Sequence, residues 1–160
     1  MRGAKGSGPG GGPPLYGIDT MLFVYHFEGN EEFGEAAGRL LKAAEEGRCR
    51  LVASVLSLME VLVVPKRRRM DDLCRRYREL FESFPNLAVL PVSSEIAELA
   101  AGLRAAHPLR TPDALHLATA LHAGAQAFVS EDRRLPGIAG LEVRSLDDVA
   151  PASISRPEQQ

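Results

Sequence analysis

Leu15-Tyr16-Gly17-Ile18-Asp19-Thr20 is a short apolar run that ends abruptly in a carboxylate. Such a run is typical of a buried strand in a parallel sheet, and the pattern of residues 20–27 after it predicts a helix. A second run of this kind, Ala127-Phe128-Val129-Ser130, is followed by Asp132. Ligands of open parallel sheets bind beyond the carboxyl ends of the strands. Asp19 and Asp132 are therefore predicted to stand at that edge.

Outward from these two runs, short apolar segments alternate with helical patterns. We expect strands at 15–18, 48–52, 88–92, 127–130 and 141–144, and helices at 20–27, 31–46, 54–64, 66–84, 93–106 and 111–123. Pro65 is expected to end the helix before it, Ser93 to cap the next helix, and Gly124 to end the last one. This alternation predicts an α/β fold with a parallel sheet covered on both faces.

The folded domain is predicted to span residues 15–150 of the 160-residue chain, a length that fits one domain. Residues 1–14 are rich in Gly and Pro and are expected to form a disordered tail, with a second polar tail at 151–160. The chain start lacks the apolar core of a signal peptide. The longest apolar stretch, residues 51–64, is too short to span a membrane.

The charge balance excludes a general polyanion binder, because the net charge is −2. Any contact with nucleic acid must therefore come from a local patch. Sixteen Arg stand against three Lys, which fits either phosphate contacts or GC-rich codon usage, and we favour codon usage. Cys49 and Cys74 have neither zinc nor disulfide spacing, which predicts a reducing cytoplasm.

Glu60 is the only charged residue between positions 51 and 64. On a helical wheel it shares a polar stripe with Ser54 and Ser57, and an unpaired carboxylate on so apolar a helix is costly to bury. A capping box from Ser57 to Glu60 is the alternative, but it would leave barely two turns before Pro65. The stripe is therefore predicted to face a site.

Taken singly, the other three acids have structural explanations. Asp19 and Asp132 can each cap the segment that follows, and Asp113 can lie in the first turn of a helix that Thr111 caps. In that turn its carboxylate would interact favourably with the helix dipole, which contributes about 0.3–1 kcal/mol of stability. If the fold brings these acids to Glu60, however, only divalent cations could hold so many like charges together. The joint pattern predicts a metal-dependent hydrolase.

Four segments carry these acids in a fixed order along residues 15–149. They are Ile18-Asp19-Thr20, Ser54-x-x-Ser57-x-x-Glu60-Val61-Leu62, Pro112-Asp113-Ala114-Leu115-His116-Leu117-Ala118-Thr119-Ala120 and Val129-Ser130-Glu131-Asp132. Their order and spacing resemble the PIN-domain nucleases, and in particular the VapC-type toxins of prokaryotic toxin–antitoxin pairs. The third segment is the most specific. Ser130 stands where that family often has Thr, which leaves a hydroxyl in place.

The resemblance implies a three-layer α/β/α sandwich with a central, mainly parallel sheet. It also implies a pocket that holds one or two Mg²⁺ or Mn²⁺ ions and hydrolyses RNA phosphodiesters. Asp19, Glu60 and Asp113 match the three core acids of the family, and Asp132 matches the fourth. Mg²⁺ takes few carboxylates directly, so we expect Asp19 and Asp113 as direct ligands. Glu60 would bind an ion directly or through water, or it would orient the nucleophile. Asp132 would serve a second ion.

Several polar residues near these acids are candidates for positioning the substrate. They are Thr20, Ser57, Arg110, Ser130 and Arg133, and Arg134 stands close by. The arginines are expected to contact RNA phosphates or an antitoxin residue. The basic run 66–69, with Arg75, Arg76 and Arg78, either guides RNA or forms a solvated helix face, and both interpretations stay open. His26, His107, His116 and His122 form no ligand set and are predicted to be structural or on the surface.

The leading functional hypothesis is a Mg²⁺- or Mn²⁺-dependent endoribonuclease toxin that a cognate antitoxin neutralises. We expect it to act in the cytoplasm, with no membrane as a partner. The resemblance also implies a homodimer. One alternative is an RNA-processing or DNA-directed PIN nuclease without a toxin role. Another is a catalytically weak PIN-like binding module, against which the four intact acids argue. A small antitoxin gene immediately upstream would separate the toxin from the processing nuclease.

Overall fold

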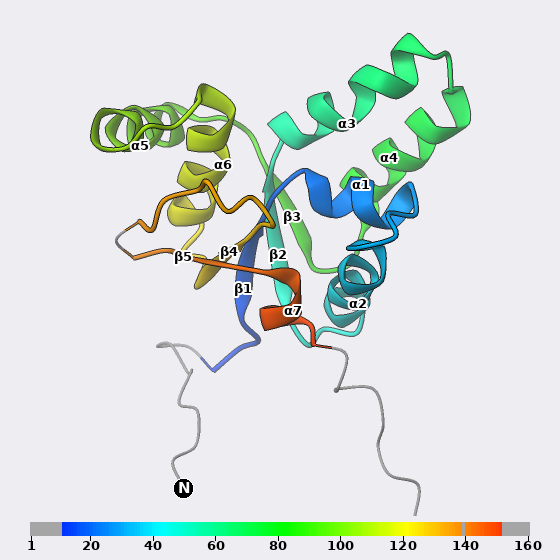
Figure 1. Ribbon diagram of the computed structural model, residues 1–160, viewed down its shortest axis with the longest axis horizontal. Helices are drawn as coiled ribbons and strands as arrows, with labels where there is room; N and C mark the ends of the chain where they lie inside the picture. The colour runs from blue at the N-terminus through cyan, green and yellow to red at the C-terminus, as the bar shows by residue number, and fades with distance from the viewer. Residues whose placement is uncertain (1–10, 139, 152–160) are drawn as a thin grey trace, which may run out of the picture.

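The sheet is the centre of the molecule (Figure 1). The computed structural model describes residues 11–138 and 140–151, so most of both predicted tails lies outside the described residues. Every strand pairs in parallel with its neighbours, in the order β3-β2-β1-β4-β5. The strands are β1 (Leu15–Ile18), β2 (Arg50–Ser54), β3 (Leu87–Leu90), β4 (Ala127–Val129) and β5 (Glu142–Arg144).

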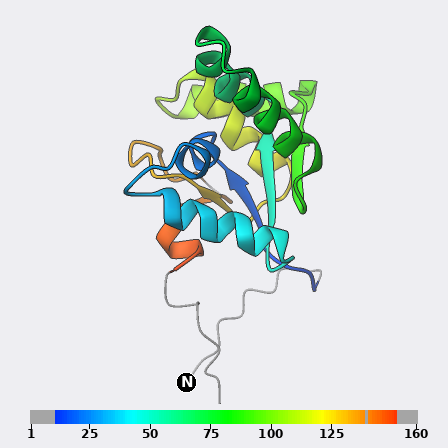
Figure 2. The same ribbon diagram turned by 90° about the vertical axis from the view of Figure 1, so that its right-hand side faces the viewer.

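Helices cover both faces of this sheet, which confirms the predicted three-layer α/β/α sandwich (Figure 2). Because side chains alternate along a strand, Leu51 and Ala53 of β2 join one core while Val52 joins the other. The helices are α1 (Met21–Phe27), α2 (Gly34–Glu45), α3 (Leu56–Arg67), α4 (Asp71–Ser83), α5 (Ser94–Ala106), α6 (Thr111–His122) and α7 (Leu146–Val149). The first core takes residues from α1 to α4, and the second takes residues from α5 and α6.

Gly17 lets α6 lie directly on the middle strand. A Cβ atom built on Gly17 would come within 2.4 Å of the Cβ atom of Ala120 and 3.0 Å of the Phe128 ring. Real Cβ atoms essentially never approach a non-bonded atom as closely as 2.4 Å, so only a residue without a side chain fits here. This close approach fixes α6, and with it the first turn of α6, relative to the end of β1.

The predicted helices at 54–64 and 66–84 were wrong at their shared boundary. Pro65 does not end α3, which continues to Arg67 with the proline ring buried in its last turn. The chain reverses at Arg69 instead, a residue with a φ angle of 55° in the left-handed region. The Met70 N–H closes the turn by donating to the Pro65 carbonyl at 2.9 Å. The segment 66–84 is therefore split between the end of α3, a turn and α4.

Two further differences concern helix ends. The cap of α6 is Arg110, and Thr111 is its first helical residue rather than its cap. Helix α7 was not predicted, and a reciprocal capping box between Ser145 and Asp148 stabilises it. The expected Ser93 cap is confirmed, since its hydroxyl accepts the Ile96 N–H at 3.2 Å.

Among the described residues, no helix is long and apolar enough to cross a membrane.

Candidate active site

Asp19 and Asp132 follow two neighbouring strands and share one hydroxyl. The Asp19 N–H donates to the Val129 carbonyl at 3.2 Å, which continues the pairing of β1 with β4. Beyond it, the buried Ser130 hydroxyl donates to Asp19 Oδ2 at 2.8 Å and accepts the Asp132 N–H at 3.1 Å. The other oxygen of Asp19, Oδ1, accepts the Met21 N–H at 3.1 Å and so helps to start α1.

Glu60 reaches the same edge from α3, which begins two residues after β2 ends. Its Oε1 accepts the Thr20 hydroxyl at 3.1 Å and lies 2.6 Å from His116 Nε2. The hydrogen bond with His116 is the largest cause of a lowered pKa for this carboxyl, in opposition to partial burial. Glu60 is therefore held in its ionised form between α1, α3 and α6.

Asp113 and Asp132 each pair with an arginine close by in sequence. Arg110 Nε donates to Asp113 Oδ2 at 3.1 Å. Arg134 forms a fork on Asp132, with Nε 3.0 Å from Oδ1 and Nη2 3.1 Å from Oδ2, and these hydrogen bonds lower the pKa of Asp132. The charge of Arg110 lowers the pKa of both Glu60 and Asp132, so its guanidinium lies within electrostatic range of both.

The four acids stand at one edge of the sheet, but their side chains are not gathered around a single point. Among residues 11–138 and 140–151, no three His, Cys, Asp or Glu side chains lie close enough together to hold a metal ion. This differs from the compact cluster that we expected. The physical reason is that like charges repel one another, and Asp113 and Asp132 turn toward their arginines.

The donors nevertheless suit a hard divalent cation, because carboxylate oxygens are the ligands that Mg²⁺ and Mn²⁺ prefer. Gathering them requires Arg110 and Arg134 to release their partners. The two arginine side chains are largely exposed, at 71% and 81%, whereas Asp113 and Asp132 are 23% and 24% exposed. Each arginine can therefore turn into solvent, and a cation in its place would keep the partly buried carboxylate paired with a positive charge.

The candidate positioning residues fall into two groups. Thr20, Ser57 and Ser130 are buried, and their hydroxyls contact protein groups. Arg110, Arg133 and Arg134 are exposed beside the acids. Ser54, which was expected on the Glu60 stripe, instead accepts the Leu56 N–H at 3.1 Å and starts α3. The alternative capping box at Glu60 does not form, because Ser57 bonds Thr20 at 2.8 Å.

His116 is the site residue that we missed, since it was expected to have only a structural or surface role. It lies on α6 one helical turn beyond Asp113 and is only 6% exposed. A signal for it was present in the sequence, because residues three apart share a helix face. That spacing places His116 on the side of α6 that carries the acid.

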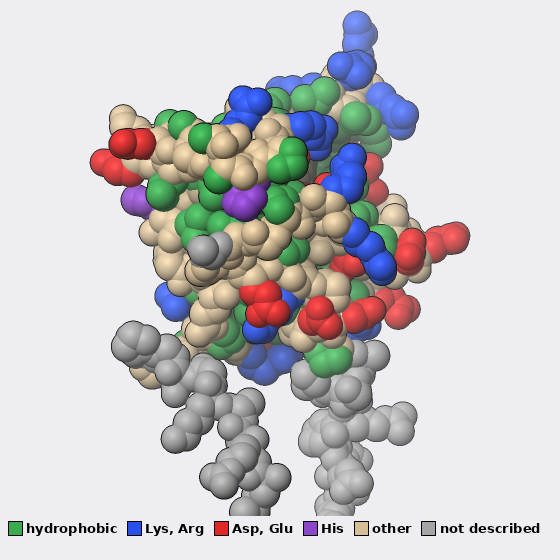
Figure 3. Space-filling model, turned by 60° about the vertical axis from the view of Figure 1, so that its left-hand side comes forward, with side chains coloured by type: hydrophobic (Ala, Val, Ile, Leu, Met, Phe, Trp, Pro, Cys, Tyr) green, Lys and Arg blue, Asp and Glu red, His purple; other side chains and the backbone are tan. Residues whose placement is uncertain are grey.

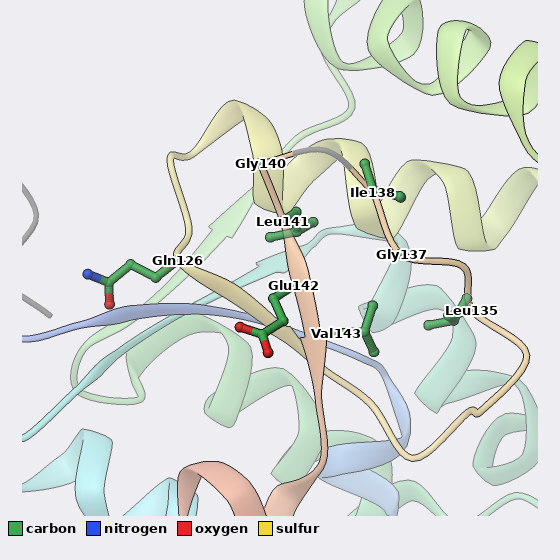
Figure 4. Close-up of a pocket in the computed structure, with 8 residues that line it drawn as sticks. All are labelled: Gln126, Leu135, Gly137, Ile138, Gly140, Leu141, Glu142 and Val143. Atoms are coloured by element: carbon green, nitrogen blue, oxygen red, sulfur yellow. The ribbon is translucent and has the colours of Figure 1, made fainter. Parts of the chain in front are cut away.

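A surface depression beside β5 is separate from these acids (Figure 4). None of the four carboxylates lines it. Its lining residues come from the loop before β4, the loop after it and β5 itself, namely Gln126, Leu135, Gly137, Ile138, Gly140, Leu141, Glu142 and Val143. The candidate site is therefore the exposed carboxyl edge of the sheet and not this depression.

Comparison with known proteins identifies the family of this fold. The PIN domain family model matches residues 16–141. Since this match covers most of the chain, the protein belongs to the PIN domain family, a family of nucleases. A comparison with curated proteins finds no match.

Solved structures that share this fold include toxin–antitoxin proteins. A toxin–antitoxin complex from Klebsiella pneumoniae has 25% identity and a TM-score of 0.60, covering 80% of this chain and 94% of that one. VapBC2 from Rickettsia felis, bound to a promoter DNA fragment, has 15% identity and a TM-score of 0.64, covering 82% and 98%. VapC20 from Mycobacterium tuberculosis, a toxin that cleaves the sarcin–ricin loop, has 18% identity and a TM-score of 0.58, covering 71% and 86%. The last two likenesses concern the fold alone.

Proposed function

We propose that this protein is a Mg²⁺- or Mn²⁺-dependent endoribonuclease and the toxin of a toxin–antitoxin pair that acts in the cytoplasm. One observation carries the proposal: Asp19, Glu60, Asp113 and Asp132 stand at one edge of a PIN-family sheet. Ser130 links Asp19 to Asp132, and Thr20, the residue after Asp19, donates to Glu60. Arg110 and Arg134 pair with Asp113 and Asp132. An acidic edge of this kind has no use in binding RNA unless cations neutralise it.

Each acid has a distinct part in the proposed reaction. Asp19 and Asp113 would hold the ion directly, and Glu60 would bind it or orient the attacking water. Asp132 would serve a second ion, once Arg134 has released it. A bound ion would supply a lowered pKa for a water molecule and stabilisation of negative charge on the phosphate oxygens.

The turn between α3 and α4 supports RNA as the substrate. Residues 66–69 are four consecutive exposed cations, and no ion pair involves them within the described part of the chain. Arg67 lies seven residues after Glu60 on α3, which places it on the same helix face about 10 Å further along. Figure 3 shows Lys and Arg side chains at the top of the molecule, where Figure 1 places the end of α3. An RNA strand that has one phosphate group at the four acids can therefore reach the cations of residues 66–69 with another.

Replacing Arg67, Arg68 and Arg69 together by Gln is expected to weaken binding of a single-stranded RNA. The slope of log affinity against log salt should fall by about 0.7 for each phosphate that the variant no longer neutralises. Binding is measured by fluorescence anisotropy in an uncleaving Asp19→Asn background.

A matched control removes equal charge from the opposite end of the sheet. The control replaces Lys42, Arg48 and Arg50 by Gln, near the start of β2. An unchanged salt slope in the turn variant, or an equal change in the control, would contradict a role for the turn in RNA binding. Loss of antitoxin binding alone would assign the turn to the protein partner.

The proposed antitoxin presents an Arg or Lys side chain to the acids. Support comes from Arg110 and Arg134, which show that guanidinium groups fit Asp113 and Asp132 at hydrogen-bonding distance. The proposed homodimer uses the outer face of α3 and of the residue that caps it, where three apolar side chains are exposed one turn apart. These are the cap residue Val55 and the helical residues Met59 and Val63, at 40%, 53% and 39% exposed. Apolar groups exposed in a row on one helix favour a protein partner.

The toxin role is tested by expression in the host. Expressing this chain alone should arrest growth, and co-expressing the gene immediately upstream should restore it. The Asp113→Asn variant is the control, and its expression should be harmless at an equal protein level. If wild-type protein is harmless in the host while the purified protein cleaves RNA, the protein is a processing nuclease and not a toxin.

A further inference from the structure

A buried chain of hydrogen bonds ends on one oxygen of Glu60. Ser57 Oγ lies 2.8 Å from Thr20 Oγ1, and the Thr20 hydroxyl donates to Glu60 Oε1 at 3.1 Å. His116 Nε2 lies 2.6 Å from the same Oε1. The Ser57, Thr20 and His116 side chains are 0%, 6% and 6% exposed, so water does not compete for these groups.

The direction of each hydrogen bond follows from counting protons. Thr20 has a single hydroxyl proton and gives it to Glu60, so Ser57 must donate to Thr20. Glu60 in its ionised form only accepts, so His116 must donate through Nε2–H. Among the described residues, Nδ1 of His116 is buried and has no hydrogen-bond partner, so the ring contacts Glu60 through Nε2 alone.

The two oxygens of Glu60 are consequently unlike. Oε1 receives two donors from inside the protein, whereas Oε2 has no hydrogen-bond partner among the described residues. The Glu60 side chain as a whole is one third exposed, so solvent reaches part of it. Two donors on one oxygen fix the rotation of the carboxylate and leave its second oxygen for a ligand.

We propose that His116, with Thr20 and Ser57 behind it, is a positioning residue that clamps Oε1 of Glu60 and presents Oε2 to the divalent cation. The proposal rests on the proposed function, because it assigns Glu60 to the cation. It gives Thr20 and Ser57 the task of holding Glu60 rather than touching the substrate. Residues that orient a ligand from behind typically contribute 10–100-fold to metal affinity.

The test compares two substitutions at one position. His116→Gln keeps an N–H near the place of Nε2, whereas His116→Met fills similar space without a donor. Mn²⁺ affinity is measured by electron paramagnetic resonance on purified protein without RNA, beside the thermal midpoint of each metal-free variant. We expect the Mn²⁺ affinity of His116→Met to be weaker than that of wild type by about 10-fold or more. The affinity of His116→Gln should stay within about threefold of wild type. A purely structural histidine would lower the midpoint in both variants without this difference in affinity.

A second variant covers the case in which His116→Met does not fold. Thr20→Val keeps the shape of the side chain and removes one of the two donors, so it should also weaken Mn²⁺ binding. Wild-type affinity in a folded His116→Met or Thr20→Val protein would overturn the clamp and leave the proposed function intact. Absence of Mn²⁺ binding by the wild-type protein would overturn the proposed function and the clamp with it.

Discussion

Replacing Asp19 by Asn is expected to abolish Mg²⁺- or Mn²⁺-dependent RNA cleavage, with a rate at least about 10³-fold lower. A bound metal supplies several kcal/mol of charge stabilisation, and about 1.4 kcal/mol corresponds to a factor of ten. Asn keeps the shape of the side chain and an oxygen for the Ser130 hydroxyl, which donates to Asp19 Oδ2 at 2.8 Å. The fold should therefore persist while the charge that holds the ion is lost. Asp113→Asn should have an effect of similar size.

The matched control makes the same chemical change away from the site. Asp147 is a highly exposed acid of α7, paired with Arg39 at 3.4 Å. Cleavage of a labelled RNA by Asp147→Asn should equal that of wild type, and excess chelator should stop both. Full cleavage by a folded Asp19→Asn, Asp113→Asn double variant, or by wild type in chelator, would refute the mechanism.

Replacing Gly17 by Ala is expected to have the largest effect on the free energy of unfolding. The new methyl group would lie 2.4 Å from the Cβ atom of Ala120, in a packed interface between β1 and α6. Overpacking of this kind lowers stability by about 1–3 kcal/mol, and the rigid neighbour favours the upper end of that range. Urea denaturation followed by circular dichroism measures the loss. Because α6 also carries Asp113 and His116, activity should fall with stability.

Gly102→Ala makes the same chemical change but is expected to change the free energy of unfolding in the opposite direction. Gly102 lies in α5, is exposed, and has open space where its Cβ atom would be. Ala is favoured over Gly inside a helix by about 0.8–1 kcal/mol, so this variant should be more stable than wild type. Destabilisation of both variants to the same extent would show that close packing at Gly17 is not the cause.

The strands and the order of the acids could be predicted because each depends on local pattern. Apolar runs such as 15–18 and 127–129 fit only buried strands once helical patterns separate them. The alternation of strands and helices then requires parallel pairing. Asp19 followed one run closely and Asp132 the other, so their place at the carboxyl edge followed from topology alone.

The features that could not be predicted depend on contacts between distant residues. Pro65 was expected to end α3, but tertiary packing buries its ring and the helix continues for two more residues. His116 was set aside because no other histidine stood at ligand spacing, while its partner, Glu60, is 56 positions away. The pairing of Asp113 with Arg110 required the geometry of a helix start, where Arg110 is the cap. Such pairings follow from folding and not from local pattern.

The most direct test of the central claim is an anomalous-difference map of crystals grown with Mn²⁺. The account predicts a peak at the carboxyl edge of the sheet, bound by Asp19 and Asp113 and near Oε2 of Glu60, with Arg110 turned away from Asp113. A peak at any other place on the protein would contradict the account, and so would an edge without a peak in crystals of protein that cleaves RNA.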